Sequence, residues 1–306
     1  MLVSKSMVGG GSAKRRNASH ATCLALALLA FACLLLTFAG AAGATVITHV
    51  SYGPRMRQYL DIYPSRTPNA PVVVLVHGGG WRVFDDLQRF ERESEALQKQ
   101  GITVFTINYD QDSPTKPAFP TEPNDVELAI QWAIENAARF DGNPNDVVLV
   151  GGSAGGQLVD VAGEQMDAAS PGSIRGVVSL SGPSDFLTLV PLIQEGIVEN
   201  ENFITSVYQA VGREENGTPY MFATQAGEEA YERTWSPADN PIANCPKWLL
   251  FNSQDELIPL SQEQEMYERL EASGCPATMD VVPGTKHAFA YWNSVSETVA
   301  SFVKSA

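Results

Sequence analysis

Short apolar runs alternate with amphipathic segments along most of the chain. The runs are rich in β-branched residues without clean alternation, as in parallel strands covered on both faces. The predicted strands are 45–50, 56–63, 72–77, 103–108, 147–151, 174–181, 248–252 and 278–282. Apolar residues at three- and four-residue spacing predict helices at 85–99, 124–140, 155–169, 261–272 and 295–303. This alternation predicts a doubly wound α/β sheet, and the short link at Gly53 predicts an antiparallel pair at one edge.

Residues 182–244 break this alternation. After Ser184 and Asp185, the stretch 186–193 is apolar, whereas 212–231 is acidic and rich in glycine. We expect an inserted cap of short helices at about 185–240. Such an insertion is either a functional lid or a loosely ordered loop, and its apolar first half favours the lid.

The N-terminal segment differs in composition from the rest. Positive charges precede an uncharged apolar run at 21–39, and Ala42-Gly43-Ala44 follows it. This layout predicts a secretory signal at 1–44, which leaves one folded domain at 45–306. The run of 19 residues is also long enough to span a bilayer, so an uncleaved anchor is the alternative. Both interpretations place the domain outside the cytoplasm.

The chain is strongly acidic. Removal of the segment 1–44 takes away four positive charges and changes the formal net charge from -15 to -19. Such a charge disfavours nucleic acid or an anionic membrane surface as a partner. It favours solubility of a secreted protein over steering of a cationic substrate.

Two cysteines remain outside the apolar run. Cys245 and Cys275 each precede a predicted strand, and neighbouring parallel strands would bring these positions together. In an oxidising compartment they predict one disulfide, with two free buried thiols as the alternative.

One serine stands between paired glycines. Gly151-Gly152-Ser153-Ala154-Gly155 follows a predicted strand and opens a predicted helix, so the turn is sharp and lifts the hydroxyl to the carboxyl end of the sheet. No lysine follows as a phosphate-binding loop requires. The pattern indicates Ser153 as a nucleophile.

A serine hydroxyl needs a base, and the base needs an orienting acid. Outside the first 44 residues the histidines are His49, His77 and His287, and only His287 follows Ser153. The loop after the preceding strand offers Asp255 and Glu256, and the pattern Asp-x-x-x-Pro favours Asp255. We therefore predict Ser153, His287 and Asp255 as the catalytic set.

Acyl transfer also needs donors for the developing oxyanion. His77-Gly78-Gly79-Gly80-Trp81 ends the third predicted strand, so Gly78 and Gly79 are expected to supply N–H groups, together with Ala154. His77 is expected to organise this loop. Trp81 and Phe289 are candidates for the substrate pocket, although Trp81 alternatively packs in the core.

At these residues the chain resembles the α/β-hydrolase fold, and within it the esterases and lipases that combine an HGGG loop with GxSxG. This group includes feruloyl and acetylxylan esterases and kynurenine formamidases. The likeness extends from Tyr52 to about Phe302 and includes the opening hairpin and the segment before the nucleophile strand. It implies a mostly parallel eight-stranded sheet flanked by helices, and no metal or cofactor.

The resulting prediction is a secreted serine carboxylic-ester hydrolase. We expect it to act through an acyl-enzyme on small acyl esters, free or carried by a polysaccharide, with no nucleic-acid partner. Amide hydrolysis, as arylformamidase or short-peptide peptidase, is the alternative on the same residues. A catalytically inactive binding protein is the rival from another class.

Overall fold

The computed structural model describes residues 45–82, 87–111, 113, 116–240 and 245–306. The predicted signal segment and the first two residues of the helix predicted at 85–99 lie outside this part. The described residues include no helix that is both long enough and apolar enough to cross a bilayer.

Eight strands form one sheet in the order β1-β2-β4-β3-β5-β6-β7-β8. β2 pairs antiparallel with β1 and with β4, whereas every other neighbouring pair is parallel. The sheet and its antiparallel edge confirm the predicted fold class. The strands are β1 (Ile47–Ser51), β2 (Tyr59–Tyr63), β3 (Ala70–Val76), β4 (Thr103–Ile107), β5 (Gly142–Gly152), β6 (Gly176–Leu180), β7 (Lys247–Ser253) and β8 (Ala277–Val282).

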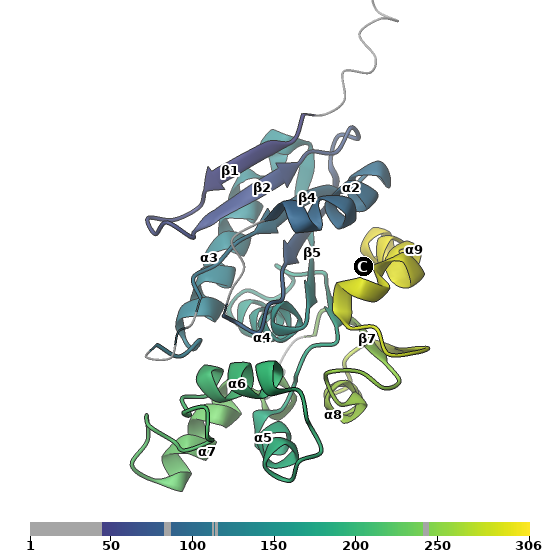
Figure 1. Ribbon diagram of the computed structural model, residues 1–306. Coiled ribbons are helices and arrows are strands. Elements are labelled where there is room, and N and C mark those ends of the chain that lie inside the picture. Colours follow the sequence, from purple (N-terminus) through teal and green to yellow (C-terminus); the bar gives the residue numbers. More distant parts are fainter. Residues whose placement is uncertain (1–44, 83–86, 112, 114–115, 241–244) are drawn as a thin grey trace, which may run out of the picture. The chain divides into compact units, whose positions relative to one another are not determined.

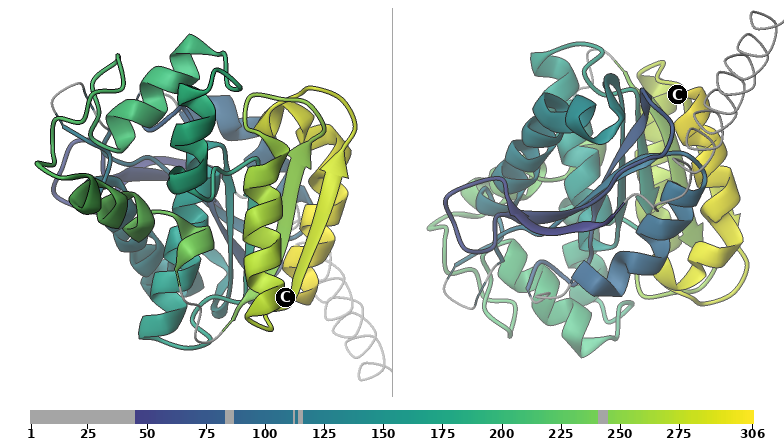
Figure 2. Two further views of the ribbon diagram at one scale, coloured as in Figure 1. Left: turned by 90° about the horizontal axis from the view of Figure 1, so that it is seen from below. Right: turned by 90° about the horizontal axis from the view of Figure 1, so that it is seen from above.

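Helices cover both faces of the sheet (Figures 1 and 2). Alternate residues of β3 point to opposite faces, so Val72 and Val74 belong to one buried cluster while Val73 and Leu75 belong to the other. One cluster packs under α3 (Thr121–Asn136), α4 (Ala154–Ala169) and α8 (Leu260–Ala272), and the other under α2 (Glu91–Lys99) and α9 (Trp292–Ser305). Four short 3-10 helices complete the described elements: η1 (Leu87–Phe90), η2 (Ala137–Phe140), η3 (Pro237–Asp239) and η4 (Ala288–Tyr291).

Three helices stand between β6 and β7, where we expected the cap. They are α5 (Phe186–Gln194), α6 (Glu201–Ala210) and α7 (Gln225–Thr234), and they lie together beyond the carboxyl ends of the parallel strands (Figure 1). Asp185, Asn200 and Thr224 cap them by accepting backbone N–H groups of the first turn. The backbone N–H groups of Ser184 and Asp185 donate to Gln262 of α8, which ties the start of this segment to the core.

The disulfide predicted from the cysteines is present. Cys245 and Cys275 precede β7 and β8, which are parallel neighbours, and their Cα atoms are 5.3 Å apart. The bridge therefore joins the starting ends of two adjacent strands.

Buried carboxyl groups tie α4 and α8 to the end of β6. Asp160 accepts the Ser179 hydroxyl at 3.0 Å, and Glu263 accepts the Gly182 N–H at 2.9 Å. Burial raises the pKa of both carboxyls, and the neighbouring Asp160 raises that of Glu263 further. Both groups therefore retain protons at pH values where exposed carboxyls are ionised.

Loss of the disulfide should destabilise the fold. The bridge closes a sequence separation of 30 residues, so a Cys245→Ser, Cys275→Ser variant should lose about 3 to 4 kcal/mol of unfolding free energy. Urea unfolding with and without reductant measures the loss, and the double variant, as control, should not respond to reductant. Equal stability of the oxidised and reduced protein would contradict this role.

Because its pKa is raised, Glu263 should make the free energy of unfolding fall as pH rises. The unfolded chain releases this proton above about pH 4.3, whereas the folded protein keeps it because burial raises the pKa, so unfolding becomes easier toward neutral pH. Unfolding free energy measured from acidic to neutral pH should fall less in Glu263→Gln. Glu268→Gln, an exposed change on the same helix, should keep the wild-type slope. An unchanged slope in Glu263→Gln would refute the assignment.

Candidate active site

Ser153 occupies the tight turn between β5 and α4. Its backbone has φ 58° and ψ -128°, a conformation that non-glycine residues rarely adopt. The Ser153 N–H donates to Leu180 O at 2.8 Å, and its carbonyl accepts the Gly156 N–H at 2.8 Å. These bonds hold the strained turn, and the half-buried side chain lines a pocket at the carboxyl end of the sheet.

Close packing around this turn requires glycine. A Cβ on Gly155 would overlap the carbonyl oxygens of Val76 and His77 at the end of β3. A Cβ on Gly78 would lie 2.6 Å from Gly152 O and 2.9 Å from the Cβ of Ser153. Because these positions lack side chains, the backbone of residues 77–81, here called the glycine loop, packs directly against Ser153.

His77 organises that loop, as its position suggested. The ring is buried, with Nδ1 2.6 Å from Gly78 O and Nε2 3.0 Å from Asn108 Oδ1, and it stacks on Tyr109 at 4.3 Å. Tyr109 also donates its hydroxyl proton to His77 O. The ends of β3 and β4 are thereby locked together below the glycines.

The three expected oxyanion donors meet around Ser153. Gly78 and Gly79 line the same pocket as the serine. Ala154 is the first residue of α4, so its N–H has no acceptor within the helix. The positive end of the helix dipole adds to the attraction for a negative oxygen at this position.

His287 lies across the pocket from the glycine loop and pairs with Glu256. Its Nδ1 hydrogen-bonds Glu256 Oε2, and the Glu256 side chain is fully buried. The other ring nitrogen, Nε2, is buried and has no hydrogen-bond partner among the described residues. Because His287 and Ser153 line the same pocket, this nitrogen is available to a nucleophile or substrate.

The choice of Asp255 as orienting acid is corrected by this geometry. Asp255 is exposed, and its backbone N–H donates to Gly284 O at 3.2 Å. Glu256 follows it, faces inward, and accepts the Ser253 N–H at 2.9 Å and the Ser181 hydroxyl at 2.6 Å. The sequence offered both acids, and the contacts of Glu256 with Ser181 and His287, which come from distant segments, show which one faces inward.

The pocket at Ser153 is small and partly aromatic. Its volume is about 360 Å³, and the Phe90 and Phe289 rings form an edge-to-face pair at 5.1 Å on its wall. A Cβ on Gly152 would lie 2.7 Å from the Phe289 ring, so the glycine before Ser153 makes room for that ring. Asn202, Phe203 and Ser206 of α6 form another wall.

Phe289 thus lies where a pocket residue was expected, but Trp81 does not. Trp81 is only 1% exposed and does not line the pocket. Its indole N–H donates to Gln157 Oε1 at 3.1 Å, and its ring packs against Phe119 and Phe186. Trp81 is absent from the pocket because its side chain packs in the core instead, against these two rings.

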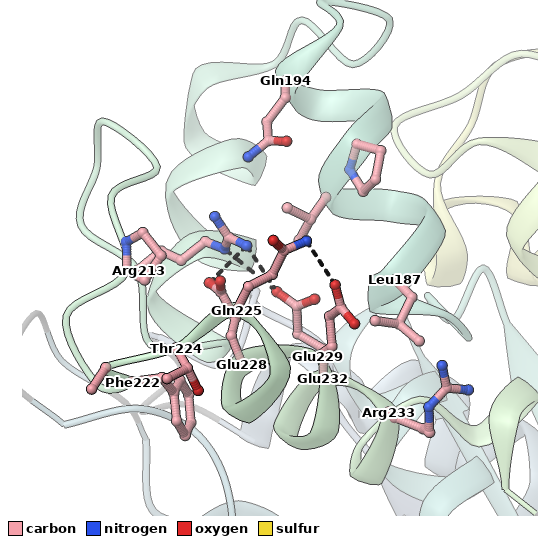
Figure 3. Close-up of a pocket in the computed structure, with 14 residues that line it drawn as sticks. Leu187, Gln194, Arg213, Phe222, Thr224, Gln225, Glu228, Glu229, Glu232 and Arg233 are labelled. Carbon is pink, nitrogen blue, oxygen red and sulfur yellow. Dashed lines mark hydrogen bonds and ion pairs between the residues drawn. The ribbon is translucent and has the colours of Figure 1, made fainter.

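A second and larger cavity lies within the cap, and Figure 3 shows its lining. Its volume is about 720 Å³, and it shares no lining residue with the pocket at Ser153. Arg213 pairs there with Glu228 at 2.7 Å and with Glu232 at 3.3 Å. Burial raises the pKa of Glu232 to about 7, against the lowering effect of Arg213. These pairs join α7 to the loop after α6, and sequence analysis did not single them out.

The described residues contain no group of three or more His, Cys, Asp or Glu side chains arranged to hold a metal ion. The pocket at Ser153 presents a serine hydroxyl, a histidine with one unpaired ring nitrogen, and backbone N–H groups.

The geometry predicts that Ser153 reacts with a serine-directed fluorophosphonate, and that Glu256 rather than Asp255 supports this reaction. Glu256→Gln should slow labelling by about a thousandfold, because the imidazole loses the carboxylate that fixes its tautomer. The matched Asp255→Asn should label at the wild-type rate. Intact mass followed over time measures both rates, with Ser153→Ala as the unlabelled control. Slow labelling of Asp255→Asn with fast labelling of Glu256→Gln would reverse the assignment.

Solved structures share this fold. A carbohydrate esterase from gut microbiota, in truncated form, superposes with a TM-score of 0.68 at 18% identity and covers 87% of this chain and 98% of that one. The carboxylesterase EstE1 from a metagenomic library superposes with a TM-score of 0.69 at 19% identity, covering 85% and 88%. Together with the sheet order, these similarities confirm the α/β-hydrolase fold.

Curated relatives are similar in sequence over most of the chain. Esterase LipC of Mycobacterium tuberculosis is 28% identical over 255 residues, which cover 78% of this chain and 59% of LipC. An acetylxylan esterase of Xylanibacter ruminicola is 24% identical over 225 residues, covering 73% of this chain and 42% of that enzyme. The chain thus matches about half the length of these relatives. The BD-FAE family model matches residues 60–270, which include Ser153 and Glu256, and the chain belongs to the BD-FAE family.

Proposed function

We propose that this protein is a secreted serine hydrolase that cleaves carboxylic esters of small acyl groups. The observation that carries the proposal is the arrangement in one pocket of Ser153, the free Nε2 of His287 and the glycine loop, with Glu256 behind the histidine. Relatives named as esterases, including the acetylxylan esterase, support the bond type.

The first half-reaction forms an acyl-enzyme. Ser153 Oγ attacks the acyl carbon while His287 Nε2 takes its proton, and the ionised Glu256 stabilises the resulting imidazolium. The negative oxygen of the tetrahedral intermediate is placed to accept N–H groups of the glycine loop and Ala154. The ester C–O bond then breaks, and the alcohol leaves with the proton from His287.

The second half-reaction restores the serine. Water gives a proton to His287 Nε2 and attacks the acyl carbon through the same oxyanion site. Collapse of this intermediate releases the carboxylic acid, and Ser153 regains its proton from His287. One ester and one water thus give one alcohol and one carboxylic acid.

The pocket supports a preference for short or flat acyl groups. Its volume of about 360 Å³ and the Phe90–Phe289 wall leave room for an acyl group of a few carbons next to Ser153. An acetyl group on a cell-wall polysaccharide fits this size, whereas a feruloyl group is longer and its flat ring would lie along the Phe90–Phe289 wall. The truncated carbohydrate esterase shares the fold. The Cys245–Cys275 bridge supports an oxidising compartment, in line with the predicted signal.

Assays with p-nitrophenyl esters of increasing acyl length test the proposal. The purified protein should show its highest kcat/KM on acetyl to butyryl esters, and kcat/KM should fall steeply on longer chains, because the pocket lined by Phe90 and Phe289 is small. Ser153→Ala should lose roughly a millionfold in kcat. p-Nitroacetanilide and an N-formyl arylamine tested in parallel distinguish the amide alternative.

Release of acetate from acetylated xylan, with deacetylated xylan as control, extends the assay to a polymer. Turnover of the amides without turnover of any ester would overturn the ester assignment. Absence of turnover and of fluorophosphonate labelling together would favour a binding protein.

A further inference from the structure

We propose that Ser181 and Tyr291 are positioning residues that hold the Glu256–His287 pair in its reactive arrangement. The inference rests on the proposed function, because it concerns the same site. Neither residue belongs to the motifs that indicated the catalytic set, and neither lines the pocket at Ser153.

Ser181 directly follows β6 and is completely buried. Its backbone has φ 58°, and its N–H donates to Phe251 O of β7 at 2.7 Å. A non-glycine residue in this region of φ/ψ space is energetically unfavourable and persists only when its surroundings enforce it. Here the conformation turns the side chain toward the loop that carries Glu256.

The Ser181 hydroxyl contacts Glu256 and the residue that follows His287. Its Oγ lies 2.6 Å from Glu256 Oε1, and it accepts the N–H of Ala288, the residue after His287, at 3.3 Å. The Ser253 N–H is a second donor to Glu256 Oε1, at 2.9 Å. One buried hydroxyl thus connects the loop after β7 to the loop after β8.

The available hydroxyl protons determine the direction of the hydrogen bonds at Ser181. An ionised carboxylate only accepts, so the single hydroxyl proton of Ser181 points to Glu256. Tyr291 OH lies 2.7 Å from Ser181 Oγ and 3.1 Å from Phe251 O, so its proton serves one or both of these acceptors. Burial raises the pKa of Tyr291, which keeps the phenol protonated and able to donate.

This arrangement has a consequence for catalysis. Glu256 Oε1 is occupied by two donors, which leaves Oε2 directed at His287 Nδ1. Without the Ser181 hydroxyl, Glu256 Oε1 keeps only the Ser253 N–H as donor, so the carboxylate is held less firmly in the orientation that faces the imidazole. The loss should appear in kcat, because the histidine carries charge in the transition state, and hardly in KM.

The test is a double-mutant cycle between Ser181 and Glu256. Ser181→Ala should lower kcat on a p-nitrophenyl acetate substrate by roughly ten- to a hundredfold with little change in KM. In the Glu256→Gln background, the same change should cost less than about threefold, because its partner has already been removed. An equal loss in both backgrounds, or no loss in either, would overturn the proposal.

Two further variants distinguish a specific effect of Ser181 on kcat from a general effect of removing a buried hydroxyl. Tyr291→Phe keeps the ring and should lower kcat by about two- to tenfold, because Ser181 loses one donor while the Ala288 N–H still orients it. An unchanged kcat would overturn the role of Tyr291. Ser179→Ala removes another buried serine hydroxyl near the end of β6, one that donates to Asp160 rather than Glu256, and should leave kcat within about threefold. A loss in Ser179→Ala as large as in Ser181→Ala would count against a specific role for Ser181.

Fluorophosphonate labelling of Ser153 provides a readout that does not need ester turnover. If the wild type labels but cleaves no ester, the proposed function fails, and the cycle can still be measured by labelling rates. If esters are cleaved and the cycle is additive, only the role of Ser181 fails. Thermal unfolding of each variant verifies that the compared proteins are folded.

Discussion

The close approach of α4 to the end of β3 is the constraint on which the rest of the site depends. Gly155 allows this approach, because a side chain there would overlap the carbonyl oxygens of Val76 and His77. The chain must then turn sharply at Ser153, and the strain of that turn is held by hydrogen bonds to the neighbouring strand and helix. The serine, the glycine loop and the free end of α4 are consequently fixed around one point.

The sheet register brings the remaining groups to the same place. β5, β6 and β7 run parallel and pair in register, so their carboxyl ends are neighbours. These three strand ends are followed by Ser153, by Ser181 and by the loop that carries Glu256. β8 follows the same direction and delivers His287 in the next loop. Residues far apart in the chain thus meet because parallel strands end at one edge of the sheet.

Most of the fold and part of the site could be predicted from the sequence. Strand and helix alternation, the pairing of Cys245 with Cys275, and the glycines around Ser153 all express local requirements that leave a clear pattern. The carboxylate that pairs with His287 could not be predicted, because Asp255 and Glu256 are adjacent and the contacts that Glu256 makes with Ser181 and His287 come from distant segments. Trp81 was ambiguous for the same reason, since its place depends on Phe119 and Phe186 from distant segments.

The proposed roles of His287 and Glu256 both require the hydrogen bond between His287 Nδ1 and Glu256, and proton NMR detects this bond directly. The wild-type protein should show a proton resonance far downfield of the amide region, arising from the proton in this hydrogen bond. The resonance should disappear in Glu256→Gln and His287→Ala, and it should remain in Asp255→Asn. A resonance that persists in Glu256→Gln and vanishes in Asp255→Asn would contradict the account.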